Sequence, residues 1–255
     1  MKFNEYLKDL CVDKKIIDTF LDIKQPNWAL YNRDTGYLLR NSMVKDGVDD
    51  SFTIATYRPY GERTMINYKH NPCRINTYGD SFTQCHQVND AETWQEYLAG
   101  HFAEPVRNYG IGGFGVYQAY LRMKEYENNP MTSAEYVILN IFDDDHYRSI
   151  DKWRWIRIGA FREEVRKTNP NYFHANPWNY VRIDSDTGEF QEYESICPDK
   201  NSLYKLCDIE FIEEYFSKDI VAHCEQAKSG GEFDKKIIKD TADMLGIVCD
   251  FSDAQ

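Results

Sequence analysis

The chain has 255 residues, 42% hydrophobic and 28% charged, and its 42 acidic residues outnumber 30 Lys and Arg to give a net charge of −12. A chain of this length, with 19 Tyr, 14 Phe and 5 Trp, can bury a large core, which excludes an intrinsically disordered protein. Because an acidic surface repels phosphates, we expect no nucleic-acid partner.

No hydrophobic run approaches the ~20 residues that a membrane-spanning helix needs. The longest run, Tyr136 to Phe142, is interrupted by Asn140. The first residues lack the basic and then apolar order of a signal peptide, although removal of a leader would leave the same start. Seven cysteines without a C-x-x-C pair suit reduced thiols better than disulfides or zinc. We therefore expect a cytoplasmic protein without a membrane span.

The first 72 residues predict an N-terminal cap. Residues 3–24 carry hydrophobic side chains at helical spacing, which predicts one or two amphipathic helices ending before Pro26. From residue 27 to about residue 71 the chain is rich in Tyr, Asp and Gly, and only Thr53 to Tyr57 and Thr64 to Tyr68 resemble short strands. We expect this stretch to be irregular.

Residues 73–148 predict a β-α-β-α-β unit. A polar residue and a Glu three positions apart, Asn89 and Glu92, form a capping box ahead of the first helix, and Pro130 closes the second. The third strand is the most apolar and is expected to be buried at the centre of a parallel sheet. The predicted elements are strands at 74–78, 105–109 and 136–142 and helices at about 90–102 and 116–126. This order predicts an α/β fold with helices on both faces of the sheet.

The regular alternation stops after His146, so residues 147–207 are interpreted as an insertion into a core that spans 73–255. Within it, Ser185 to Gly188 predict a hairpin turn between strands at 180–183 and 190–193. Hydrophobic stripes predict further helices at 209–223 and 233–245. No internal repeat is present.

Three loops at strand ends carry the polar residues. Ligands of parallel sheets bind where the strands end, so residues 79–81, 108–115 and 143–146 are expected to meet there. The sequence YGDSFT at residues 78–83 resembles block I of the SGNH (GDSL) hydrolases, and VRNYGIGGFG at residues 106–115 resembles their block II. The resemblance covers about residues 73–148. It implies a three-layer αβα fold of flavodoxin-like type, with Ser81 as nucleophile and the Gly113 N–H as an oxyanion donor.

The residue chemistry agrees with this resemblance. A serine at a strand-to-helix turn lies close to backbone N–H groups that can stabilise an oxyanion. Asp80 is expected to support the turn by accepting backbone hydrogen bonds, and Asn108 and Gly112 are expected to border the substrate. The structural alternative is that Ser81 only caps a helix and that the glycines only permit tight turns.

The third block departs from the family pattern. Where the family has an Asn that donates to the oxyanion, this chain has Asp144 or, in the earlier register, Asp143. An ionised carboxylate cannot donate and repels the developing charge, which costs ~3–4 kcal/mol or more. Three explanations stay open: burial protonates the Asp, the turn differs, or the cluster holds a cation. Because consecutive side chains point in different directions, we expect no metal site and no cofactor.

The general base of the family comes from a D-x-x-H motif, which this sequence lacks. Asp219 and His223 are one residue too far apart and lie on a predicted helix. His86 is expected at the surface or behind the site, and His146 is a candidate for the pocket. Our hypothesis is that the chain is the N-terminal part of a longer protein, with the remaining strands and the catalytic histidine beyond residue 255.

These observations favour a serine-dependent ester hydrolase that acts on an acyl ester of a small molecule, a carbohydrate or a lipid. The chain as it stands is expected to have weak activity or none. Two alternatives remain: a non-catalytic ligand-binding module with the same pocket, and a metal-assisted hydrolase centred on Asp143 to Asp145.

Overall fold

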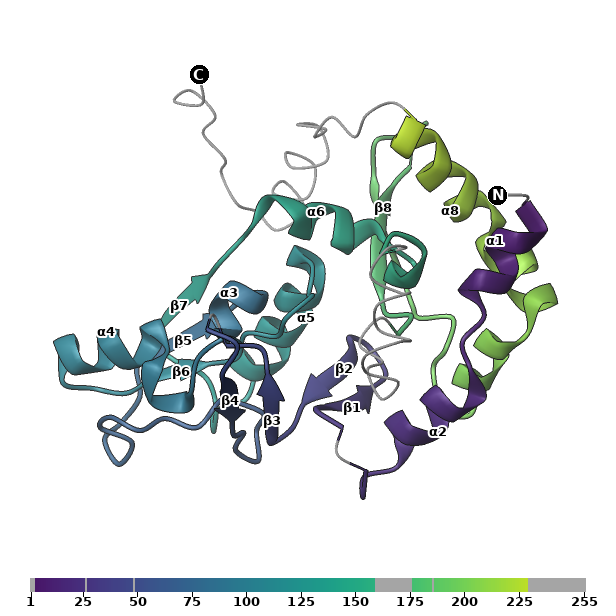
Figure 1. Ribbon diagram of the computed structural model, residues 1–255. Coiled ribbons are helices and arrows are strands. Elements are labelled where there is room, and N and C mark those ends of the chain that lie inside the picture. The colour runs from purple at the N-terminus through teal and green to yellow at the C-terminus, as the bar shows by residue number, and fades with distance from the viewer. Residues whose placement is uncertain (1–2, 26, 48, 159–175, 185, 229–255) are drawn as a thin grey trace.

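The computed structural model describes residues 3–25, 27–47, 49–158, 176–184 and 186–228. These residues form an α/β structure in which a small parallel sheet and its helices lie at one end, while the N-terminal helices and the long last helix lie at the other (Figure 1). The helix expected at 233–245 and the hypothesis of missing strands concern residues outside the described part of the chain.

The N-terminal segment is more regular than expected. Two helices, α1 (Phe3–Leu10) and α2 (Lys14–Leu21), confirm the prediction for residues 3–24, and Asp13 caps α2 by accepting from Lys15 N at 2.7 Å. The prediction of an irregular stretch was wrong, because two antiparallel hairpins follow. Their strands are β1 (Ala29–Asn32) with β2 (Gly36–Leu39), and β3 (Ser42–Lys45) with β4 (Phe52–Ala55).

Local turn chemistry explains the first hairpin. The Asn32 side chain accepts from the backbone N–H groups of Asp34 and Thr35 at 3.0 and 2.9 Å, and Gly36 takes a left-handed φ of +78°. The strand expected at Thr53 to Tyr57 overlaps β4. The other three strands have four residues each, which is too short to show a reliable alternation, so the sequence pattern missed them. The strand expected at Thr64 to Tyr68 is absent from the described structure, where only an isolated bridge joins Tyr57 and Arg63.

The predicted β-α-β-α-β unit is confirmed. Strand β5 (Ile75–Tyr78) lies between β6 (Val106–Asn108) and β7 (Tyr136–Leu139) and pairs with both in parallel register. The connecting helices are α3 (Ser81–Gln84), the 3-10 turn η1 (Asp90–Glu92), α4 (Trp94–Phe102) and α5 (Val116–Glu127). The capping box of Asn89 and Glu92 is present, but it caps η1. Helix α4 contacts β6 and α5 contacts β5.

The third strand is not the buried centre that its apolar sequence predicts. In the described structure β7 is an edge strand, and its Tyr136, Val137 and Ile138 side chains remain 52%, 41% and 40% exposed. The central position belongs to β5, whose four residues are all buried. Burial of both faces of an apolar strand is favourable, but it requires other segments of the chain to cover the strand.

The Asp-rich turn is also different from the prediction. Residues 143–150 form helix α6 (Asp143–Ile150), so regular structure continues past His146. Asp145 reaches back to accept from Phe142 N at 3.1 Å, which closes the first turn of the helix. Three consecutive acidic residues at its start also suit the positive end of the helix dipole.

The later elements agree with the prediction where the structure describes them. A 3-10 turn η2 (Arg154–Ile156) precedes the expected hairpin of β8 (Tyr180–Ile183) and β9 (Phe190–Tyr193). The 3-10 segment η3 (Ser202–Cys207) then leads into helix α8 (Ile209–Lys228), which contains the predicted hydrophobic stripe.

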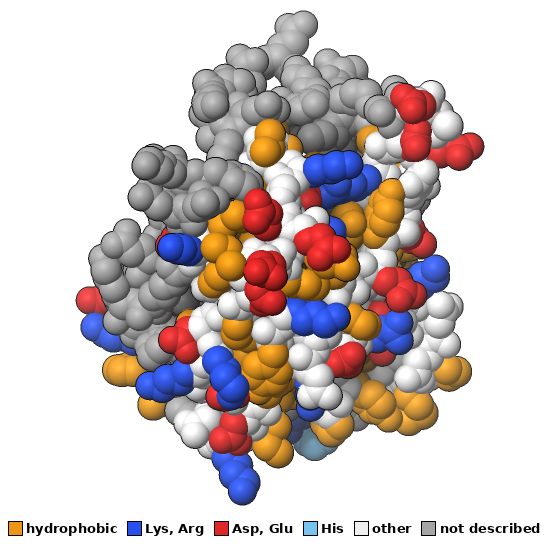
Figure 2. Space-filling model, turned by 90° about the vertical axis from the view of Figure 1, so that its right-hand side faces the viewer, with side chains coloured by type: hydrophobic (Ala, Val, Ile, Leu, Met, Phe, Trp, Pro, Cys, Tyr) orange, Lys and Arg blue, Asp and Glu red, His pale blue; other side chains and the backbone are white. Residues whose placement is uncertain are grey.

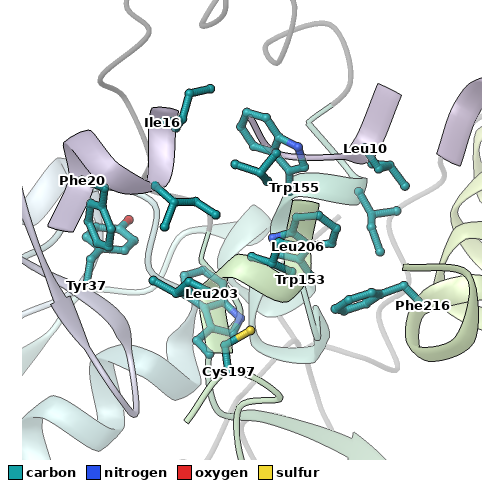
Figure 3. Packing of buried hydrophobic residues seen from close by; sticks show 14 of the residues in the cluster. Leu10, Ile16, Phe20, Tyr37, Trp153, Trp155, Cys197, Leu203, Leu206 and Phe216 are labelled. Carbon is teal, nitrogen blue, oxygen red and sulfur yellow. The ribbon is translucent and has the colours of Figure 1, made fainter. Parts of the chain in front are cut away.

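The largest hydrophobic cluster among the described residues joins the N-terminal helices to α8. Side chains from α1, α2, η2, η3 and α8 converge in it, including Trp153, Trp155 and Phe216 (Figure 3). The described parts of segments 1–72 and 147–207, interpreted above as cap and insertion, therefore share one core. Seen from the side of α1, α2 and α8, acidic and basic side chains are interspersed with hydrophobic patches on the outer surface (Figure 2). A second cluster under the sheet contains only Ile75, Ala99 and Val106 as buried members.

Candidate functional site

A cavity of about 290 Å³ lies where the sheet meets the N-terminal hairpins, and Ser81 lines it. Its apolar wall consists of Trp28, Leu39, Val44, Ala55, Tyr57 and Ile158, mostly from the hairpin region. Its polar residues include Ser81, Gln84, His86, Arg148 and Arg154, with the backbone of Gly112 and Gly113. The pocket therefore brings the first two predicted loops together with residues from distant parts of the chain.

Ser81 follows β5 through a constrained turn. Gly79 has a φ of +150°, and a side chain there would collide with Thr83 and with the Asn140 backbone oxygen. Asp80, which is 1% exposed, accepts from Phe82 N at 2.9 Å, as expected for a residue that supports the turn. Ser81 lines the cavity, and its hydroxyl and backbone N–H have no hydrogen-bond partner among the described residues.

The second loop is fastened directly beside Ser81. Ile111 N donates to Gly79 O at 3.0 Å, and Gly112 N donates to the Gln84 side-chain oxygen at 2.6 Å. A Cβ added to Gly112 would lie 3.5 Å from Ser81 Cβ. The predicted residue Asn108 is buried and braces this loop by accepting from Gly110 N at 2.9 Å. Asn108 thus shapes the site without lining the cavity.

Gly113 occupies a position that only a glycine fits without strain. Its φ of +87° is left-handed, and a side chain would collide with Arg154 and Tyr37. The Tyr37 hydroxyl donates to Gly112 O, and Arg154 Nη1 donates to Gly113 O at 3.1 Å. Because a trans peptide directs its C=O and N–H in opposite directions, the Gly113 N–H points away from Tyr37. It donates to no acceptor in the described part of the chain.

The third loop does not place a carboxylate in the cavity. Asp143 is exposed, and the Asp144 side chain bonds to Arg148 Nε and Arg157 Nη1, both at 2.7 Å. Burial opposes ionisation of Asp144, but Arg157 and Arg148 outweigh it and lower the pKa of Asp144. None of Asp143 to Asp145 lines the cavity. An ionised Asp144 therefore does not face an oxyanion formed at Ser81.

Asp145 is the carboxylate that burial affects most. It is 2% exposed, and burial together with the nearby Asp80 raises the pKa of Asp145 to about 7, although Arg148 Nη1 at 2.7 Å opposes this shift. The described residues contain no group of three or more possible metal ligands. Because Asp144 and Asp145 already bond to arginines, the loop offers little to a cation.

His86 and His146 are placed differently from the prediction, whereas His223 lies on a helix, as expected. His86 is half-buried and lines the cavity, and its carbonyl oxygen accepts from the Thr53 hydroxyl at 3.1 Å. His146 is 4% exposed on α6 and is not part of the cavity lining. Burial lowers the pKa of His146, and its Nδ1 atom has no hydrogen-bond partner. His223 lines a separate cavity of about 520 Å³.

Several site residues were not found from the sequence. Gln84 lies three residues after Ser81 and holds the second loop, but a lone Gln carries no recognisable signal. Tyr37 and Arg154 come from the hairpin and η2 regions, where the pattern predicts no site. Arg148 lies four residues after Asp144, so a correct prediction of helix α6 would have placed the two on one face.

Comparison with known proteins found no family model, no curated protein and no solved structure that matches the chain. Among the described residues, no helix is both long and apolar enough to cross a membrane.

Proposed function

We propose that the protein is a serine-dependent ester hydrolase of SGNH type, with Ser81 as its nucleophile. The observation that carries this proposal is the shared cavity, in which the Ser81 hydroxyl lies beside the loop that contains Gly113. The two free backbone N–H groups, of Ser81 and Gly113, come from loops that hydrogen bonds hold together. This arrangement supports acyl transfer, since it combines a nucleophile with preorganised donors.

The proposed reaction begins when Ser81 Oγ attacks the acyl carbon of an ester. The carbonyl electron pair moves to oxygen, the Ser81 and Gly113 N–H groups hold the resulting charge, and the serine proton passes to a general base. The alcohol then leaves, and water releases the acid from the acyl-enzyme. The apolar wall of the cavity suits a small acyl group or a small alcohol.

The proposed reaction needs a general base that takes the proton of the Ser81 hydroxyl. No histidine is hydrogen-bonded to Ser81 in the described residues. His86 is the histidine that lines the described cavity, so it is the first to test. His86→Asn should slow labelling of Ser81 by an active-site probe, whereas His146→Asn should not. Equal rates for both variants would remove His86 from the reaction.

The experiment that tests the proposal is covalent labelling with a fluorophosphonate probe. Ser81 Oγ attacks the phosphorus atom of the probe and fluoride leaves, so labelling reports an activated serine. We expect the unchanged protein to be labelled and Ser81→Ala not to be. The matched control is Ser42→Ala, because Ser42 lines the same cavity and should not react. Equal labelling of Ser81→Ala, or no labelling of the unchanged protein, would overturn the proposal.

A non-catalytic binding module is the second candidate. The observation that favours it is the Ser81 hydroxyl, which has no base within hydrogen-bonding distance in the described structure. This function predicts that small esters or acids raise the melting temperature while no product forms. Release of acid from a bound ester would contradict it.

A further inference from the structure

Arg148 lies near Ser81, but the reaction proposed above gives it no role. Its side chain is only 10% exposed, yet it lines the cavity that contains Ser81. It comes from helix α6, which follows the third strand of the sheet. A buried guanidinium beside a proposed nucleophile is informative, because its planar fork can donate to several acceptors at once.

The guanidinium lies between the two loops that supply the proposed donors. Its Nη1 atom donates to Phe114 O at 3.2 Å and approaches an Asp80 carboxylate oxygen at 3.5 Å. Phe114 follows Gly113 directly, and Asp80 directly precedes Ser81. Arg148 therefore contacts the neighbours of both proposed N–H donors.

Two carboxylates hold Arg148 in a single orientation. Asp145 accepts from Nη1 at 2.7 Å, and Asp144 accepts from Nε at 2.7 Å. The remaining nitrogen, Nη2, donates to no acceptor in the described residues. It is also not one of the fully buried polar atoms that lack a partner, so its surface is accessible. The anchored fork thus leaves one donor accessible, on a residue that lines the cavity.

We propose that Arg148 Nη2 donates to the oxyanion that forms when Ser81 attacks an acyl carbonyl. This inference rests on the proposed function. It assigns to a charged side chain the stabilisation that the carboxylates of this loop cannot supply. Asp144 then acts as a positioning residue, since it holds the guanidinium and lies outside the cavity lining. Preorganised donors of this kind are effective because they need no reorganisation as charge develops.

The test compares labelling rates with the fluorophosphonate probe, whose phosphoryl oxygen takes the place of the oxyanion. We expect Arg148→Gln to lower the second-order labelling rate by about 10²- to 10³-fold, the usual effect of losing one oxyanion donor. Arg148→Lys keeps the charge but not the fork and should give an intermediate rate. Circular dichroism and a cooperative melt establish that each variant is folded.

The matched control is Arg122→Gln. Arg122 is also a buried arginine, at 2% exposure, and it bonds to Gly61 O at 2.7 Å outside the cavity. We expect its loss to lower the melting temperature and to leave the labelling rate of the folded protein unchanged. If the folded Arg122→Gln and Arg148 variants slow labelling equally, the effect is structural and the inference is overturned.

Other outcomes separate the inference from the proposed function. If the unchanged protein is labelled at Ser81 and folded Arg148→Lys reacts at the same rate, the role of Arg148 is wrong while the hydrolase proposal stands. If Arg148→Gln fails to fold, Arg148→Lys still decides the question. No labelling of the unchanged protein overturns the proposed function and this inference with it.

A steady-state comparison distinguishes an oxyanion donor from a substrate anchor. With p-nitrophenyl acetate and the carboxylate-bearing p-nitrophenyl hemisuccinate, Arg148→Lys should lower kcat to the same extent and change KM little. If Arg148→Lys only raises KM, and only for the hemisuccinate, Arg148 binds the substrate carboxylate and the inference is overturned.

Discussion

The cluster around Phe216 and the sheet that carries Ser81 are held together by different forces. In the cluster, buried aromatic rings contact one another, as Trp153 and Phe216 do at 4.9 Å between ring centroids. On the face of the sheet toward α5, a single carboxylate of Glu127 accepts from the Tyr78 hydroxyl at 2.6 Å and from the Asn76 amide at 2.7 Å. One region depends on hydrophobic burial, whereas the other depends on buried polar groups whose partners must all be present.

This difference explains where the candidate site lies. The cavity forms at the boundary, where Tyr37 of the cluster donates to the Gly112 backbone beside Ser81. A close-packed cluster can hold such a donor in place, since its side chains have little freedom to move. The polar region supplies the charged groups. We expect the cluster to determine overall stability and the boundary to determine activity.

The strongest test of this comparison is Phe216→Ala in the cluster. Removing a fully buried ring from α8 should lower the free energy of unfolding by about 3–5 kcal/mol, measured by urea denaturation. Tyr215→Ala is the matched control, because Tyr215 is the neighbouring aromatic residue on the same helix and is 41% exposed. Similar losses for both variants would show that the cluster does not dominate stability.

The polar region is tested by Glu127→Ala. This change leaves the Tyr78 hydroxyl and the Asn76 amide without their shared acceptor, at a cost of roughly 2–4 kcal/mol in the free energy of unfolding. Glu125→Ala, on an exposed position of the same helix, should have almost no effect. If Glu127→Ala is as mild as its control, the sheet does not depend on this network.

A pH series tests the boundary through Asp145. Burial and Asp80 raise the pKa of Asp145 from 3.8 to about 7 in the folded chain. The folded state therefore keeps a proton that the unfolded state has lost, so this stabilisation is complete below pH ~4 and declines as the pH rises through 7. Relative to Asp145→Asn, the unchanged protein should lose roughly 1–3 kcal/mol of unfolding free energy between pH 5 and pH 8. Parallel pH curves from urea denaturation would contradict the raised pKa.

The smallest effect is expected at the exposed edge strand. Val137→Lys on β7 should change the free energy of unfolding by no more than about 0.5 kcal/mol, since Val137 is 41% exposed. The same denaturation experiment provides the measurement. A loss above about 2 kcal/mol would mean that Val137 is covered in solution. The sheet region would then also depend on a hydrophobic core.

Much of the sheet region was predictable because its signals are local. The capping box at Asn89, the glycines of the second loop and the apolar run of β7 each depend on a few neighbouring residues. Hairpins of four-residue strands leave weaker patterns, so β1 to β3 were missed, and the acidic start of α6 was interpreted as a turn. Each β strand here is short, and short strands gain their stability from partners that a local pattern does not contain.

The sequence by itself determined the order of the β-α-β-α-β unit and the loops that carry Ser81 and Gly113, because hydrophobic spacing and turn residues act locally. Only the tertiary structure decided the rest. It turned Asp144 away from the cavity, brought Arg148 into it and built its apolar wall largely from the N-terminal hairpin region. These outcomes depend on burial and on ion pairs between residues far apart in the chain, such as Arg148 and Asp80.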